Sequence, residues 1–146
     1  MKKLALLLLV ILAAAAAWFL GGGNDNMSSS KRAKQIALGR QLYAENCASC
    51  HGANLEGQPD WKVPGPNGRL PAPPHDTSGH TWHHADEQLF AITKFGTAAI
   101  VGNGYESDMP GFANSLNDNE IQAVLNYIKS TWPEREAGYQ QDISRR

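Results

Sequence analysis

The chain has 146 residues, a length that suits one domain with a modest core. Its 13 basic and 14 acidic residues leave a formal net charge of −1, which argues against nucleic-acid binding because that function needs a concentrated basic face. Hydrophobic residues make up only 42% of the chain, and its two cysteines cannot build a disulfide-rich mini-protein. We therefore expect another stabilising element besides apolar packing.

Residues 1–23 have the pattern of an export segment. Lys2 and Lys3 precede an unbroken apolar run over residues 4–20, and three glycines follow it. The run is longer than the core of most signal peptides and slightly shorter than the roughly 20 residues of a membrane-spanning helix. A signal cleaved after Ala17 or within the glycines and a retained membrane anchor both fit. Either one predicts that the rest of the chain is exported to the periplasm.

The exported part begins with a polar linker, predicted at residues 24–32. Apolar residues then recur at helical spacing over residues 31–46. Residues 52–84 break every periodicity and hold six of the eight prolines, which predicts a long loop. A loop of this length in a small domain usually wraps around something.

A second helix is predicted over residues 84–95, where acidic residues suit the first turn and Gly96 suits the end. Residues 97–113, with several glycines and Pro110, predict another long loop.

The clearest helix follows Asn117, which caps it together with Glu120, and ends before Pro133. Residues 133–146 are predicted to be a C-terminal tail. Because no segment has the pattern of paired strands, we expect an all-α fold with short helices and long loops.

The sequence Cys47-Ala48-Ser49-Cys50-His51 at the end of the first helix is the attachment signature of a c-type haem. Two thiols on one helical turn reach the two vinyl groups of a porphyrin and form thioethers. The adjacent His51 then offers its imidazole to the iron. One covalently attached haem c is therefore the predicted cofactor.

Other uses of the two cysteines fit less well. A redox dithiol of the Cys-x-x-Cys type expects a βαβ context, which the pattern lacks. A zinc site needs two more ligands, and His75 and His80 follow Cys50 at a spacing unlike that of common zinc fingers. A disulfide between Cys47 and Cys50 explains neither His51 nor the long loops.

Met109 is the candidate for the sixth iron ligand. Met1 belongs to the export segment and Met27 to the linker, whereas Met109 precedes Pro110-Gly111 in an irregular loop. A methionine in such a loop packs poorly into a core, and His/Met ligation saturates the iron and raises its potential. The neighbouring Asp108 is expected to face solvent.

These motifs, in this order, resemble class I cytochrome c of the small, single-haem, bacterial type. The resemblance covers residues 33–132. Gly39 and Tyr43 match the Gly/aromatic pair before the haem signature, Met109-Pro110 matches the distal ligand loop, and the stretch from Leu125 to Trp132 matches the closing helix. The absence of a side chain at Gly39 also predicts that another helix packs closely against it.

The resemblance implies that His51 donates its second ring proton to a proline carbonyl, which fixes the ligand tautomer. Four prolines of the long loop are candidates: Pro64, Pro66, Pro71 and Pro73.

Four of the five histidines lie within ten residues, at His75, His80, His83 and His84. One interpretation is a second metal site, because imidazoles suit copper. Others are a polar loop at the haem edge, a hydrogen bond from Trp82 or a histidine to a haem propionate, packing at a helix start, and histidine ligation of the haem in place of Met109.

We expect a periplasmic electron carrier and no enzyme, because no residues indicate acid–base or nucleophilic catalysis. The redox partners are expected to dock transiently, and the membrane is a partner only if residues 4–20 remain uncleaved. A haem-based gas or redox sensor and a copper-handling protein are the alternative functions.

Overall fold

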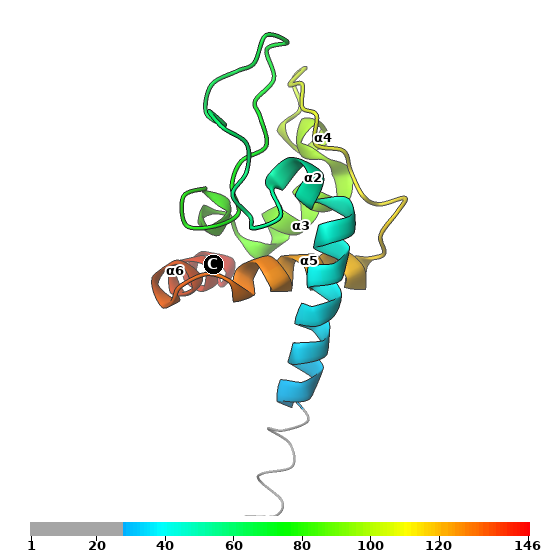
Figure 1. The fold of residues 1–146 in the computed structure, drawn as a ribbon, viewed down its shortest axis with the longest axis vertical. Helices are drawn as coiled ribbons and strands as arrows, with labels where there is room; N and C mark the ends of the chain where they lie inside the picture. The colour runs from blue at the N-terminus through cyan, green and yellow to red at the C-terminus, as the bar shows by residue number, and fades with distance from the viewer. Residues whose placement is uncertain (1–27) are drawn as a thin grey trace, which may run out of the picture. The chain divides into compact units, whose positions relative to one another are not determined.

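The computed structural model describes residues 28–146 (Figure 1). The predicted export segment and residues 24–27 lie outside the described residues. The chain divides into two compact units, Met1–Lys34 and Gln35–Arg146. In the first unit the described residues 28–34 are helical, so part of the predicted linker is helix. Among the described residues, no helix combines the length and apolarity that a membrane crossing requires.

The second unit is built from helices and loops, in agreement with the expected all-α class. Helical structure continues to residue 46 and is followed at once by the short α2. The remaining elements in chain order are α2 (Ala48–His51), the 3-10 helix η1 (Thr81–His83), α3 (Asp86–Phe95), α4 (Thr97–Val101), α5 (Asp118–Ser130) and α6 (Glu134–Ser144). Between α2 and η1 the long loop is drawn in green at the top of Figure 1.

Two predicted boundaries differ from the structure. The second helix begins at Asp86 and not at residue 84, because Ala85 is extended. The segment 97–113 contains α4 at its start, so only its later part is loop. Five residues between Gly96 and Gly102 are too few to show a helical period in the sequence.

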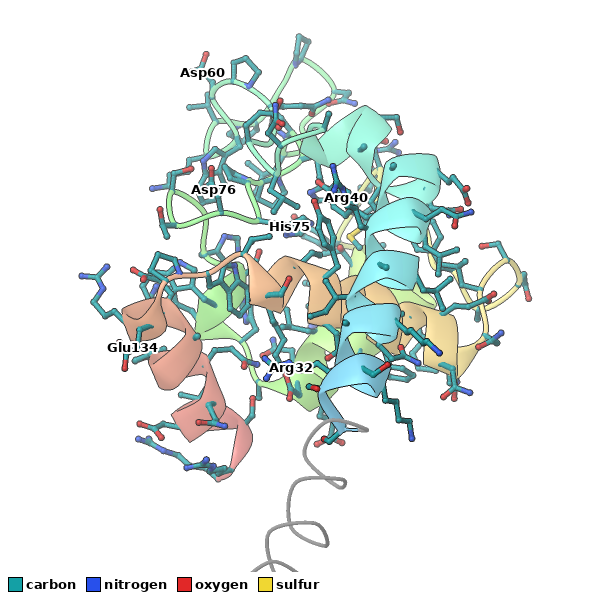
Figure 2. All side chains as sticks on the ribbon, turned by 60° about the horizontal axis from the view of Figure 1, so that its bottom comes forward. Arg32, Arg40, Asp60, His75, Asp76 and Glu134 are labelled. Carbon is teal, nitrogen blue, oxygen red and sulfur yellow. The ribbon has the colours of Figure 1, made fainter. Side chains whose placement is uncertain are left out.

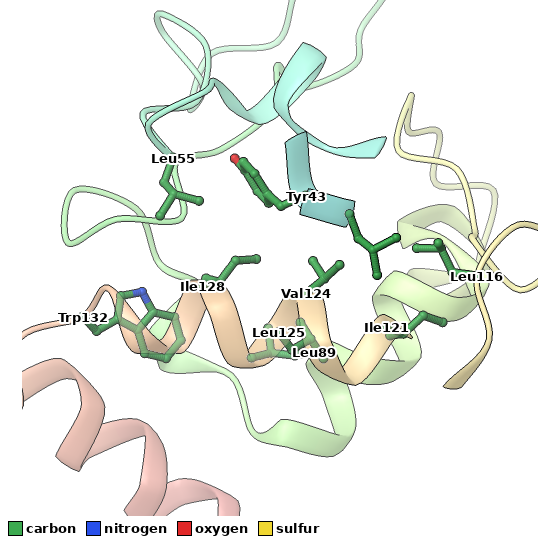
Figure 3. Packing of buried hydrophobic residues seen from close by; sticks show 10 residues of the cluster. Tyr43, Leu55, Leu89, Leu116, Ile121, Val124, Leu125, Ile128 and Trp132 are labelled. Carbon is green, nitrogen blue, oxygen red and sulfur yellow. The ribbon is translucent and has the colours of Figure 1, made fainter. Parts of the chain in front are cut away.

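The core lies where α5 meets the N-terminal helix and the loops (Figure 3). Tyr43, only 1% exposed, lies over Val124 and Ile128 of α5. The predicted cap of α5 is confirmed, because the Asn117 side chain accepts a hydrogen bond from the backbone N–H of Glu120 and the Glu120 carboxylate accepts one in return. The other members of the core are Leu42, Leu55, Leu89, Leu116, Ile121, Leu125 and Trp132.

The close helix approach predicted at Gly39 is confirmed. A Cβ atom placed there lies 1.9 Å from the carbonyl oxygen of Ala123 and 2.9 Å from the Cβ of Tyr127. No L-side chain fits in that space unless the helices separate. The Tyr127 ring also packs against Tyr43, with 5.5 Å between ring centroids.

The segment predicted as a tail is mostly the helix α6, which packs against η1 and α3. Its two buried residues, Glu136 and Gln140, are polar, and the half-buried Ser144 follows at the same interval of four residues. The Gln140 amide donates to the carboxylate of Asp86 at 2.6 Å and lies 3.3 Å from the carbonyl oxygen of His84. The same carboxylate binds Lys129 of α5 at 2.6 Å. A helix held by polar contacts has no apolar stripe, so the hydrophobic pattern did not predict it.

The contact at Gly39 yields a stability prediction. We expect Gly39→Leu to lower the melting temperature of the holoprotein, because overpacking of a close contact costs about 1–3 kcal/mol. Gly138→Ala in α6 is the matched control, since an added Cβ there meets nothing within 4 Å. Thermal melts followed by circular dichroism measure both variants. Equal melting temperatures for Gly39→Leu and the wild type contradict the close approach.

The polar face of α6 yields a second prediction. We expect Gln140→Leu to reduce the free energy of unfolding by about 0.5–1.5 kcal/mol, because the half-exposed Asp86 carboxylate and the His84 carbonyl lose a buried donor. Gln141→Leu, at an exposed position of the same helix, is the control and should change stability little. Urea denaturation of both variants gives the comparison, and similar losses in the two would show that the bond to Asp86 contributes nothing.

Candidate functional site

The turn of helix at α2 places the three signature residues together. Cys47 continues the first helix, because its N–H donates to the Tyr43 carbonyl at 2.8 Å. The N–H of His51 donates to the Cys47 carbonyl at 2.9 Å, so both ends of the signature share one turn. Gly52 then ends α2 with φ at 81°, a conformation that suits glycine. Its carbonyl oxygen accepts a hydrogen bond from the Tyr43 hydroxyl at 2.8 Å, which ties the turn to the core.

The two cysteines are free thiols, Cys50 exposed and Cys47 half-buried against the core. Burial, followed by the nearby Cys50, raises the pKa of the Cys47 thiol to about 11. A redox dithiol needs a lowered thiol pKa, since the thiolate is the reactive form. The environment of Cys47 therefore does not suit a dithiol–disulfide centre, whereas a thioether carries no ionisable proton.

His51 is the buried member of the signature, with 6% of its surface exposed. Its Nδ1 atom lies 2.8 Å from the carbonyl oxygen of Pro73, and a carbonyl only accepts, so the proton resides on Nδ1. Burial lowers the pKa of His51, an effect that the bond to Pro73 opposes. A neutral imidazole with a fixed Nδ1–H presents its Nε2 lone pair to a metal. Of the four candidate prolines, Pro73 is the one that meets His51.

His75, one of the four clustered histidines, lies against His51. The two rings are stacked, with 4.1 Å between centroids and 24° between planes. His75 lies near the middle of the molecule in Figure 2, where the long loop returns toward α5. Of the clustered histidines, His75 is the one that stacks on His51. The sequence did not predict this contact, because it depends on the path of the long loop.

Met109 lies on the loop between α4 and α5, which folds back against the C-terminal end of α3. Its sulfur accepts a hydrogen bond from the Thr97 hydroxyl at 3.3 Å. After Met109 the loop runs tightly past α3, because Gly96 and Gly111 face each other; a Cβ on Gly96 lies 2.9 Å from the Gly111 nitrogen. Phe112 and Ala113 then donate their N–H groups to the Thr93 and Lys94 carbonyls at 3.0 Å. In the described residues no hydrogen bond joins Met109 to the signature residues.

Arg69 connects the two loops that carry the site. Its guanidinium binds the carboxylate of Asp108, next to Met109, and lies 3.7 Å from Glu106. Arg69 itself belongs to the long loop that supplies Pro73. Asp108 faces solvent as expected, with 61% of its side chain exposed, and it also pairs with Arg69. No sequence signal marks the Arg69–Asp108 pair, since its members lie 39 positions apart in the chain.

Two buried side-chain nitrogens in the described part of the chain have no hydrogen-bond partner, Arg69 Nε and Trp82 Nε1. Buried donors are nearly always satisfied, so an orphan indicates a missing acceptor. Arg69 Nε faces the Glu106 carboxylate at 3.7 Å, beyond hydrogen-bond distance, whereas no acceptor lies at Trp82 Nε1. The carboxylates of a haem are acceptors of the kind that the Trp82 indole needs. Together with the free thiols and the oriented His51 ring, the residues present fit a covalently bound haem.

The other cluster histidines contact aromatic rings. His80 stacks on Trp61, with 5.2 Å between centroids, and His83 packs against Trp82 and Tyr139. The His84 Nδ1 atom lies 3.2 Å from the Gln88 side chain. Within residues 28–146, no three side chains of His, Cys, Asp or Glu gather closely enough to hold a metal ion. The copper interpretation therefore finds no support in the described residues.

Comparisons with known proteins agree with this geometry. The family model for cytochrome c matches residues 36–132. Cytochrome c6 of Tetradesmus obliquus is 33% identical over 97 residues, which cover 64% of this chain and 86% of the relative. FixP, a cbb3-type cytochrome c oxidase subunit of Bradyrhizobium sp. (strain ORS 278), is 24% identical over 69% of this chain and 29% of the relative.

CcoP, a cbb3-type cytochrome c oxidase subunit of Azospirillum sp. (strain B510), is 30% identical over 66% of this chain and 28% of the relative. The chain thus spans under a third of either oxidase subunit. No solved structure matches it. The family match covers most of the chain and includes both the cysteine signature and the methionine loop, so the chain belongs to the cytochrome c family and its cofactor is a covalently bound haem c.

Proposed function

We propose that this protein is an exported electron carrier whose haem is attached through Cys47 and Cys50, with His51 and Met109 as axial ligands. The observation that carries the proposal is the 2.8 Å hydrogen bond between His51 Nδ1 and the Pro73 carbonyl. This bond leaves Nε2 as the nitrogen that is free for iron. It also restricts rotation of the ring about its Cβ–Cγ bond, which orients Nε2.

The haem supplies reversible one-electron exchange at its iron. The protein's part is to hold the two axial groups in place in both oxidation states. Thr97 directs a hydroxyl proton to one lone pair of the Met109 sulfur, at 3.3 Å, and so leaves the other lone pair free. The paired glycines at the end of α3 and the ion pair of Arg69 hold the two ends of the methionine loop.

Saturated ligation favours electron transfer over catalysis, because no coordination position stays open for a substrate. We therefore propose that the chain is not itself an enzyme. The sensor alternative needs a Met109 that leaves the iron readily. The contacts of Met109 at both ends of its loop and at its sulfur favour the carrier.

The export pattern of residues 1–23 supports a periplasmic location, with either a cleaved signal or a retained anchor. Two of the relatives are subunits of cbb3-type oxidases. We propose that the partners are redox proteins that dock transiently, and that an oxidase is a suitable acceptor. Without Lys2 and Lys3 the chain has 11 basic and 14 acidic residues, so a partner surface with some positive charge complements it.

Spectra of ligand variants test the proposed ligation. We expect the wild type to show one haem per chain and the weak sulfur-to-iron absorption band of the oxidised protein. Met109→Ala should lose this band and bind carbon monoxide rapidly in the ferrous form, whereas Met27→Ala, outside the family match, should keep it. A band that survives Met109→Ala contradicts methionine ligation, and rapid, complete carbon monoxide binding by the wild type favours the sensor.

The ion pair beside Met109 gives a separate prediction. We expect Arg69→Gln and Asp108→Asn each to raise the rate of carbon monoxide binding to the ferrous protein a few-fold, because the methionine loop then separates more often from the long loop. The double variant should exceed neither single variant, since both remove the same contact. Arg145→Gln, which removes an exposed pair within α6, is the control. Strictly additive effects in the double variant would contradict a shared contact between Arg69 and Asp108.

A further inference from the structure

His75 makes a contact with His51 that ligation does not require. The hydrogen bond to Pro73 lies in the plane of the His51 ring, whereas the His75 ring covers one face of it at 4.1 Å. An in-plane bond leaves the ring some freedom to tilt about the axis through that bond. A second ring on the face restricts this tilt.

The His75 ring is itself fixed. Its Nδ1 lies 2.8 Å from the hydroxyl oxygen of the buried Thr81, which lies 3.4 Å from the Pro74 carbonyl. The carbonyl accepts the hydroxyl proton, so the Thr81 oxygen accepts from Nδ1–H of His75.

The backbone around His75 is held as well. The N–H of His75 donates to the Leu55 carbonyl at 2.8 Å, and its carbonyl oxygen accepts from the Trp132 indole at 2.7 Å. The Tyr43 ring lies edge-on to the His75 ring, with 6.3 Å between centroids. Hydrogen bonds to Nδ1 and to both backbone groups, together with the Tyr43 ring, fix the His75 ring. A fixed ring in face-to-face contact can restrict the orientation of the His51 ring.

The stacking places the π face of the His75 imidazole against the His51 ring. A neutral imidazole stacks on a second imidazole without charge repulsion. Its π face also carries the partial negative charge that attracts a positive neighbour.

We propose that His75 is a positioning residue for the iron ligand His51: it fixes the plane of the His51 ring and, through its π face, stabilises the oxidised form of the haem site. This rests on the proposed role of His51 as an axial ligand. An imidazole bound to ferric iron is more electron-poor than one bound to ferrous iron, so the stacked face favours the ferric state. The stack therefore lowers the reduction potential relative to an aliphatic side chain.

Substitution of His75 in the full-length holoprotein tests the proposal. We expect His75→Leu to raise the reduction potential and to shift the electron paramagnetic resonance g-values of the ferric haem, which report the orientation of the axial ligand planes. His75→Phe restores an aromatic face and should stay much closer to the wild type in both measurements. His80→Leu is the matched control, because His80 stacks on Trp61 and has no ring contact with His51.

Thr81→Val provides a second route that leaves His75 in place. It removes the hydrogen bond that orients the His75 ring, so we expect broadened or shifted g-values in the same direction as in His75→Leu. This variant keeps the test decisive if His75→Leu does not accumulate as holoprotein.

Potential and g-values that are unchanged in His75→Leu and in Thr81→Val overturn the proposal. An equally large shift in His75→Phe and His75→Leu also overturns it, because repacking would then explain the effect. If His51→Ala keeps the wild-type haem spectrum, His51 is not an axial ligand, and both the proposed ligation and this inference are wrong. If the haem spectrum depends on His51 but the reduction potential and g-values of the His75 variants equal those of the wild type, only the inference about His75 is overturned.

Discussion

The hydrogen bond between His51 and the Pro73 carbonyl is the constraint on which the arrangement of the site depends. It joins the single turn of α2 to a loop that has no regular structure between residues 52 and 80. Because this one bond orients the imidazole, the path of the loop determines the orientation of the His51 ring. The backbone bond of Gly57 to His51 holds the loop against the turn, and the bond of His75 to Leu55 joins the two ends of the loop. The long loop is thus part of the site and not only a connection.

The site is assembled from parts whose local stability differs. α2 and the His51 ring are anchored to the core through Tyr43, whereas the methionine loop depends on two glycines, two backbone bonds and one surface ion pair. Exposed ion pairs contribute little to stability, so the methionine side is expected to open first.

Short-range chemistry in the sequence predicted much of this structure. The spacing of Cys47, Cys50 and His51, the cap at Asn117 and the bare backbone at Gly39 each depend on a few neighbouring positions or on one missing side chain, so they are visible in the sequence alone. The features that escaped prediction are long-range or polar. The Arg69–Asp108 pair and the His51–His75 stack depend on how two loops fold back, and α6 buries amides and carboxylates that hydrophobic periodicity does not detect.

The polar face of α6 has a consequence for motion. The helix lies beyond the segment that the cytochrome c family model matches, and its contacts with Asp86 and His84 are hydrogen bonds that water can replace. Separation of this interface exposes less of the hydrophobic core than separation of the helices at Gly39, because the buried residues of α6 are the polar Glu136 and Gln140. The Tyr139 ring of α6 contacts both the indole of Trp82 and the exposed imidazole of His83. The docking of the C-terminal helix is therefore coupled to the packing of these three rings.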